Sequence, residues 1–125
     1  MIEKYQQIVS MLLTLTSEER VEWEKTSGNE YKVNIGNNYI TILYHEANPY
    51  IVVANATPDN DFLKLLLWNQ NGELIDEVKI EKRDFASTDY DNLMALDVAA
   101  RRSYGKVYDT LDSIISDLNK VSKED

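Results

Sequence analysis

The spacing of apolar residues changes twice along this chain, and this change limits the possible folds more than any other feature. Residues 2–15 and 88–122 place apolar side chains three or four positions apart, whereas residues 31–80 alternate with a period of two. The first spacing is typical of one face of a helix, and the second of a half-buried strand. We therefore predict an α+β fold, in which an antiparallel meander sheet of five to six strands is flanked by an N-terminal helix and a long or bent C-terminal helix.

Turn residues divide the central part of the chain into strands. Gly36-Asn37-Asn38 and Asn69-Gln70-Asn71-Gly72 favour tight reversals, and Thr57 to Asp61 has the composition of a loop. Residues 17–25 are open to two interpretations. Thr16-x-x-Glu19 resembles a capping box that would start a short helix, while the alternation around Trp23 favours a strand that turns at residues 26–29. We favour the strand. The other predicted strands are residues 31–35, 39–44, 50–54, 62–68 and 74–80.

The last third of the chain has one continuous apolar stripe at helical spacing. A capping box at Thr88-x-x-Asp91 is predicted to open this helix, with Asp89 at its positive end. An unbroken helix over 88–122 would be about 52 Å long, whereas a compact domain of this size has a radius of gyration of roughly 14 Å. Such a helix would either break near Gly105 or reach a second subunit. We favour a bend at residues 103–106, because glycine destabilises a helix interior.

Both faces of the predicted sheet carry apolar residues. Ile40, Ile42 and Tyr44 would face one side, and Tyr39 and Leu43 the other. The runs at 51–53 and 62–68 repeat this pattern, whereas an antiparallel sheet with one face in water should alternate with polar residues. The second face therefore needs a cover, which the chain's own helices, a curled sheet or another protein would supply.

Length and composition limit the classes of function. The 125 residues are expected to form a single domain over 1–125. No cysteine is present and there is one histidine, His45, which removes thiolate and two-histidine metal sites, so we expect no cofactor and no metal. The net charge of −9 disfavours direct binding to nucleic acid or to anionic membranes. Without a signal peptide or a long apolar run, a cytoplasmic location is expected.

Few residues are candidates for specific chemistry, and we predict no catalytic residue. Asp97 and Arg101 lie one helical turn apart and can pair, and with Arg102 they could hold a carboxylate or phosphate, although an exposed helix face explains the same pattern. Asp59-Asn60-Asp61 resembles the start of a calcium loop but lacks the remaining ligands. Aromatic and apolar residues are common at interfaces, and the further binding candidates of this kind are Tyr39, Leu43, Tyr104 and Tyr108.

These observations favour a protein-binding or regulatory domain over an enzyme. An inhibitor, an immunity-type protein, an adaptor or a specialised chaperone would fit, with the second sheet face or the long helix as its binding surface and a homo-oligomer as its simplest complex. One alternative is a binder of small ligands, or a simple carboxylate-dependent hydrolase, with a pocket on a curled sheet. Another is an acidic mimic of DNA.

Overall fold

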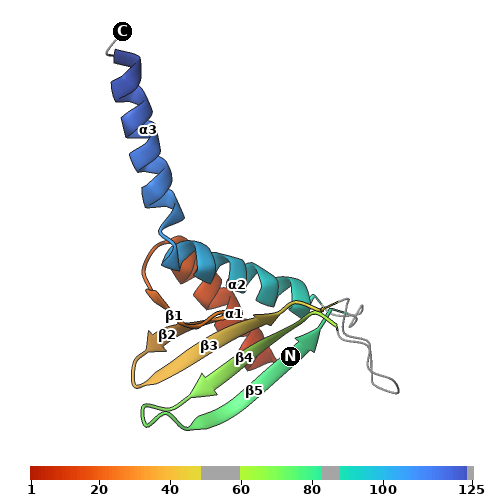
Figure 1. The fold of residues 1–125 in the computed structure, drawn as a ribbon. Helices are drawn as coiled ribbons and strands as arrows, with labels where there is room; N and C mark the ends of the chain where they lie inside the picture. The colour runs from red at the N-terminus through yellow and green to blue at the C-terminus, as the bar shows by residue number, and fades with distance from the viewer. Residues whose placement is uncertain (49–59, 83–87, 124–125) are drawn as a thin grey trace.

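The structure, a computed structural model, describes residues 1–48, 60–82 and 88–123, except for the side chain of Tyr108. These residues form an α+β fold in which two helices lie on one face of an antiparallel sheet and a third helix points away from it (Figure 1). The sheet has the order β1-β2-β3-β4-β5, as in a meander. In chain order the elements are α1 (Glu3–Ser17), β1 (Trp23–Ser27), β2 (Glu30–Ile35), β3 (Asn38–His45), β4 (Phe62–Trp68), β5 (Leu74–Glu81), α2 (Asp89–Tyr104) and α3 (Val107–Lys123).

The antiparallel register brings the apolar residues of the strands into rows. Trp23 on β1 pairs with Val33, Val33 with Ile40, and Ile40 with Leu67. A second row joins the next alternate positions of β2 to β5 and consists of Tyr31, Ile42, Leu65 and Val78. Because side chains alternate between the faces of a strand, both rows point to the same side, where they form the floor of the core.

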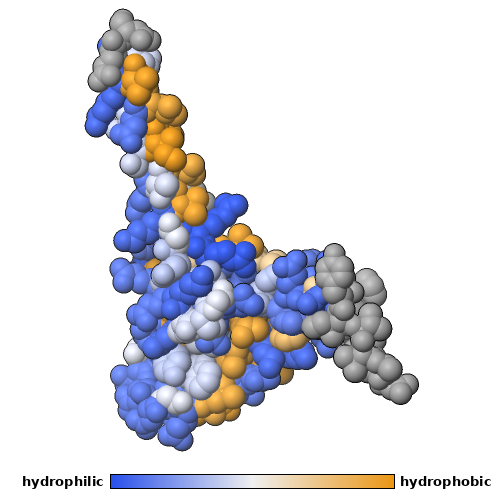
Figure 2. Space-filling view, viewed as in Figure 1, coloured by the Kyte–Doolittle hydropathy of each residue, from blue (hydrophilic) through white to orange (hydrophobic). Residues whose placement is uncertain are grey.

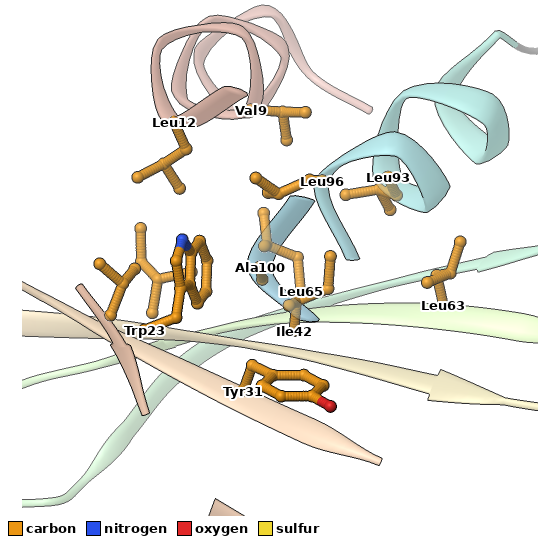
Figure 3. Packing of buried hydrophobic residues seen from close by; sticks show 12 residues of the cluster. Val9, Leu12, Trp23, Tyr31, Ile42, Leu63, Leu65, Leu93, Leu96 and Ala100 are labelled. Atoms are coloured by element: carbon orange, nitrogen blue, oxygen red, sulfur yellow. The ribbon is translucent and has the colours of Figure 1, made fainter. Parts of the chain in front are cut away.

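Helices α1 and α2 cover this floor (Figure 3). On α2 the spacing of three and four places Leu93, Leu96 and Ala100 on one fully buried face. Val9 and Leu12 of α1 are buried in the same cluster. Among the described residues, the buried core is therefore formed by α1, α2 and the sheet, and none of its members comes from α3.

The prediction that residues 17–25 favour a strand is confirmed in part, since β1 begins at Trp23. The alternative interpretation, in which Thr16 caps a second short helix, is wrong, because Thr16 belongs to the last turn of α1. Its side chain is buried, and its hydroxyl oxygen accepts a hydrogen bond from the indole N–H of Trp23 at 2.9 Å. A buried indole N–H needs an acceptor, and this need explains why a threonine stands at that position.

The start of α2 also differs from the prediction. Thr88 stands at the N-cap position with helical backbone angles, and its side chain makes no capping hydrogen bond. Asp89 instead forms an ion pair with the amino group of Met1 and accepts a hydrogen bond from Gln6 Nε2 at 3.2 Å. The positive end of α2 is thus used to fix the N-terminal segment. The predicted strand at residues 50–54 lies outside the described residues.

The second face of the sheet is covered largely by its own side chains. The rings of Tyr39 and Trp68 stack with centroids 5.7 Å apart, and the indole N–H of Trp68 donates to the Thr41 hydroxyl at 2.9 Å. Lys32 lies 4.3 Å from the centre of the Tyr39 ring. Beneath these groups Thr41 is only 2% exposed and Leu66 9%. Aromatic rings and the stem of Lys32 therefore shield Thr41 and Leu66 on this face.

Candidate functional site

The largest group of uncovered apolar side chains in the described structure lies on α3. We call this group the α3 stripe, and its members are between 36% and 64% exposed. Figure 2 shows it as one continuous band along the projecting helix. No residue of α3 with a described side chain is buried. The α3 stripe consists of Val107, Leu111, Ile114, Ile115, Leu118 and Val121.

Five of these six residues follow a heptad spacing. From Val107 the steps to the next apolar residue are four, three, four and three, ending at Val121. This pattern keeps the side chains on one seam of a helix, and it is the pattern by which helices pack against each other in coiled coils and four-helix bundles. Leu111 and Leu118 occupy the a positions of the heptad, Val107, Ile114 and Val121 the d positions, and Ile115 the neighbouring e position.

An isolated helix with this composition needs a packing partner. The 17 residues of α3 are close to the length at which helices are marginal in water, and most helical stability in proteins comes from the burial of an apolar face. Asp109 near the start and Lys120 and Lys123 near the end interact favourably with the helix dipole. These charges add tenths of a kcal/mol to about 1 kcal/mol each, less than the stripe would gain by being covered.

The junction between α2 and α3 makes the stripe project. The predicted break at residues 103–106 is confirmed, because α2 ends at Tyr104 and α3 begins at Val107. Lys106 has a φ of 51°, a left-handed conformation that disfavours side chains other than glycine, and its N–H bonds to the carbonyl of Ser103. The change of direction leaves α3 pointing away from the sheet (Figure 1). The predicted C-terminal helix is therefore divided into α2 and α3, and α3 also projects beyond the sheet.

The predicted pair of Asp97 and Arg101 is present, but not on an exposed face. Asp97 is fully buried on α2, and its Oδ2 accepts a hydrogen bond from Arg101 Nη2 at 2.5 Å. Burial raises the pKa of Asp97, and the charge and hydrogen bond of Arg101 oppose that rise. Oδ1 is buried without a hydrogen-bond partner among the described residues. Since Asp97 already holds Arg101, the two do not form an open anion site.

Arg102 lies elsewhere, in a groove of about 730 Å³ beside α2. The groove runs from the end of α1 to the beginning of α3, and its apolar lining includes Val21, Met94 and Val98. Lys106 contributes a second positive charge. Its carboxylates, Glu19, Glu22, Asp91 and Asp109, are all exposed, and Asp97 is not part of the lining. The structure thus places the one buried carboxylate with a raised pKa away from the groove.

The remaining candidates lie at separate places. Tyr39 and Leu43 are half-buried on the second sheet face. Tyr104 ends α2 and lies against Tyr31, with ring centroids 5.9 Å apart. The side chain of Tyr108 lies outside the described part of the chain. The structure therefore does not bring Tyr39, Leu43, Tyr104 and the arginines into one site.

The described part of the possible calcium loop has a structural role. Asp61 accepts hydrogen bonds from the Ala47 amide at 2.7 Å and from the Tyr44 hydroxyl at 3.3 Å. Burial, together with the nearby charge of Asp61, raises the pKa of Tyr44 to about 12. Within the described ranges no three acidic or histidine side chains are grouped so as to hold a metal ion. Nor is any described helix long and apolar enough to span a membrane.

The sequence pattern predicted the apolar spacing of α3 and named the long helix as a possible binding surface, but it placed these residues on one continuous stripe with Leu93, Leu96 and Ala100. None of the six residues of the α3 stripe was among the individual site candidates. One available signal was the length of the predicted helix, which exceeded the size of the domain. No protein-family model matches the chain, and neither a curated protein nor a solved structure matches it.

Proposed function

We propose that the protein is a protein-binding domain that associates with further copies of itself, and that the α3 stripe is the association surface. The observation that carries the proposal is the heptad-spaced apolar face of α3, which no other described part of the chain covers. A partner that covers it must present a matching apolar seam. Another copy of α3 presents that seam because its sequence is identical.

The expected gain is of the same size as the cost of association. Full burial of an aliphatic side chain contributes about 1.5–3 kcal/mol. Because the stripe residues are roughly half exposed, covering them contributes on the order of 1 kcal/mol each, or about 6 kcal/mol for each copy. Association itself costs about 4–15 kcal/mol in lost freedom of motion. Two copies gain about 12 kcal/mol together, so burial of the α3 stripe offsets the lower and middle part of this cost.

The charges of α3 also fit a second copy. Asp109, Asp112 and Asp117 precede Lys120 and Lys123 along the helix, so one end is acidic and the other contains both lysines. Two antiparallel copies would place opposite charges and opposite helix dipoles beside each other. In this proposal the part of the chain before Val107, which we call the body, is the folded unit that α3 brings together. Any regulatory role would then follow from the assembly.

The test is the mass of the full chain in solution, measured by light scattering after size-exclusion chromatography. The wild type should have a mass that is a multiple of 14.4 kDa. Leu118→Asp places a charge in the seam and should give the monomer mass. Ser116→Asp adds the same charge away from the stripe and should leave the mass unchanged. A monomeric wild type at tens of micromolar would refute the proposal.

One observation favours a second candidate function, the binding of a small apolar ligand in the groove. Val98 and Met94 offer an apolar surface there, whereas four carboxylates against Arg102 and Lys106 disfavour an anionic ligand. The fluorescence of an uncharged apolar dye, Nile red, should therefore rise with the wild type. Val98→Glu should abolish the rise, whereas Leu118→Asp should retain it if the dye binds in the groove and not on α3.

A further inference from the structure

Covering the α3 stripe completely requires more than one neighbouring helix. Two helices bury only a narrow seam of a and d residues, but Ile115 at the e position widens the apolar face on one side. A two-helix contact would leave Ile115 at its edge, and it would extend over only about 25 Å of helix. A larger assembly covers the e position as well.

The residues of the seam disfavour a parallel pair of helices. In parallel coiled coils, pairs form best with β-branched residues at a and leucine at d, whereas leucine at a and isoleucine at d favours higher numbers of helices. In α3 the a positions are Leu111 and Leu118, and the d positions Val107, Ile114 and Val121 are all β-branched. The arrangement is thus the reverse of the one that favours two parallel helices.

An antiparallel arrangement matches the side chains across the contact. With the register centred at Ser116, Leu111 of one copy faces Val121 of another, and Ile114 faces Leu118. On one flank of the helix, Ile115 then meets Ile115 of one neighbour. The seam and the flank that carries Ile115 therefore both find an apolar counterpart on an antiparallel neighbour.

The charge of the bodies agrees with this orientation. The residues before Val107 include 17 acidic and 11 basic side chains, so each body has a net negative charge. Parallel helices would gather all the bodies at one end, where they would repel each other. Antiparallel helices distribute them between both ends of the bundle.

We infer that four copies of the chain associate, each contributing α3 to an antiparallel four-helix bundle with two bodies at each end. This inference rests on the proposed function and specifies its partner as three further copies. Tetramers with three perpendicular twofold axes are the common closed form for four identical chains, and they give each helix two different antiparallel neighbours.

Mass in solution distinguishes this inference from the proposed function. Light scattering on the full chain should give four times 14.4 kDa. A mass of two or three copies would overturn the four-helix bundle and leave self-association through α3 intact, whereas a monomer would overturn both. Ile115→Gln should reduce the mass from four copies to two, and Ser116→Gln should not. An unchanged mass for Ile115→Gln would overturn the apolar contact on that flank.

Cysteine cross-linking tests the orientation, because the chain has no cysteine of its own. The double variant Leu111→Cys with Val121→Cys should form disulfide-linked chains under mild oxidation, while each single variant should not. Helical circular dichroism confirms that each variant is folded. Linked chains from either single variant would show parallel neighbours and overturn the antiparallel bundle.

Discussion

Trp23 donates its indole N–H to the hydroxyl of Thr16 at 2.9 Å, and this bond joins the first strand to the last turn of α1 inside the core. Thr16→Val keeps the shape of the side chain but leaves the buried N–H without an acceptor. We expect the variant to lose about 1–3 kcal/mol of stability, measured by urea denaturation. The control is Thr14→Val, at an exposed position of the same helix, which should change stability by no more than ~0.5 kcal/mol. Equal stability of the two variants would contradict the role of the bond.

The turn before β5 depends on a glycine conformation. Gly72 has a φ of 80°, and its N–H bonds to the carbonyl of Asn69. Gly72→Ala should lose about 1–2 kcal/mol in the same denaturation experiment, because a Cβ atom disfavours this conformation. Gly28→Ala is the matched control, since Gly28 has no positive φ and an added Cβ would meet nothing within 4 Å. It should be neutral or slightly stabilising.

The buried carboxylate of α2 should give the protein a specific pH dependence. Burial raises the pKa of Asp97 above its ordinary 3.8, with Arg101 opposing part of the rise. The folded state thus retains this proton to a higher pH than the unfolded state does. The stability linked to Asp97 is present below pH 3.8 and is lost as pH rises through the folded pKa.

Asp97→Asn removes that titration, so its free energy of unfolding should fall less than that of the wild type as pH rises from about 4 toward neutrality. Urea denaturation at a series of pH values measures the difference. Asp109→Asn, at an exposed position of α3, should follow the wild-type curve. Parallel curves for Asp97→Asn and the wild type would show that Asp97 ionises normally.

The second sheet face should not contribute to assembly if α3 is the association surface. Leu43→Glu introduces a charge on this face between Glu30 of β2 and Lys64 of β4, and should lower stability by about 1 kcal/mol. Its mass by light scattering should equal that of the wild type. A change in mass for Leu43→Glu, with no change for Leu118→Asp, would move the association surface from the helix to the sheet.

Much of the fold follows from local sequence patterns. The Phe62–Trp68 strand has the predicted bounds, and the break near Gly105 follows from the helix penalty of glycine. The predicted helix caps were the least accurate part of the sequence analysis. Thr16 has the right spacing for a capping box, but a distant partner, Trp23, uses its hydroxyl. Local spacing carries no information about such a partner, and the same is true of Asp89, which pairs with the amino group of Met1.

The candidate site was harder to predict because periodicity reports that a face is apolar, not what covers it. Leu96 and Leu118 belong to stripes with the same spacing, yet Leu96 is buried under the chain's own fold and Leu118 is exposed. The two apolar faces of the sheet posed the same difficulty. Stacking of Tyr39 on Trp68, together with Lys32, covers residues that alternation alone suggested were open.

In the proposed assembly, the short connection at Gly105 and Lys106 separates two properties of the chain. Side chains before the connection fold the body, and side chains after it set the number of chains that come together. Substitutions after the connection can therefore alter stoichiometry while leaving the melting behaviour of the body intact. A different helix attached at Lys106 would give the same body a new multiplicity.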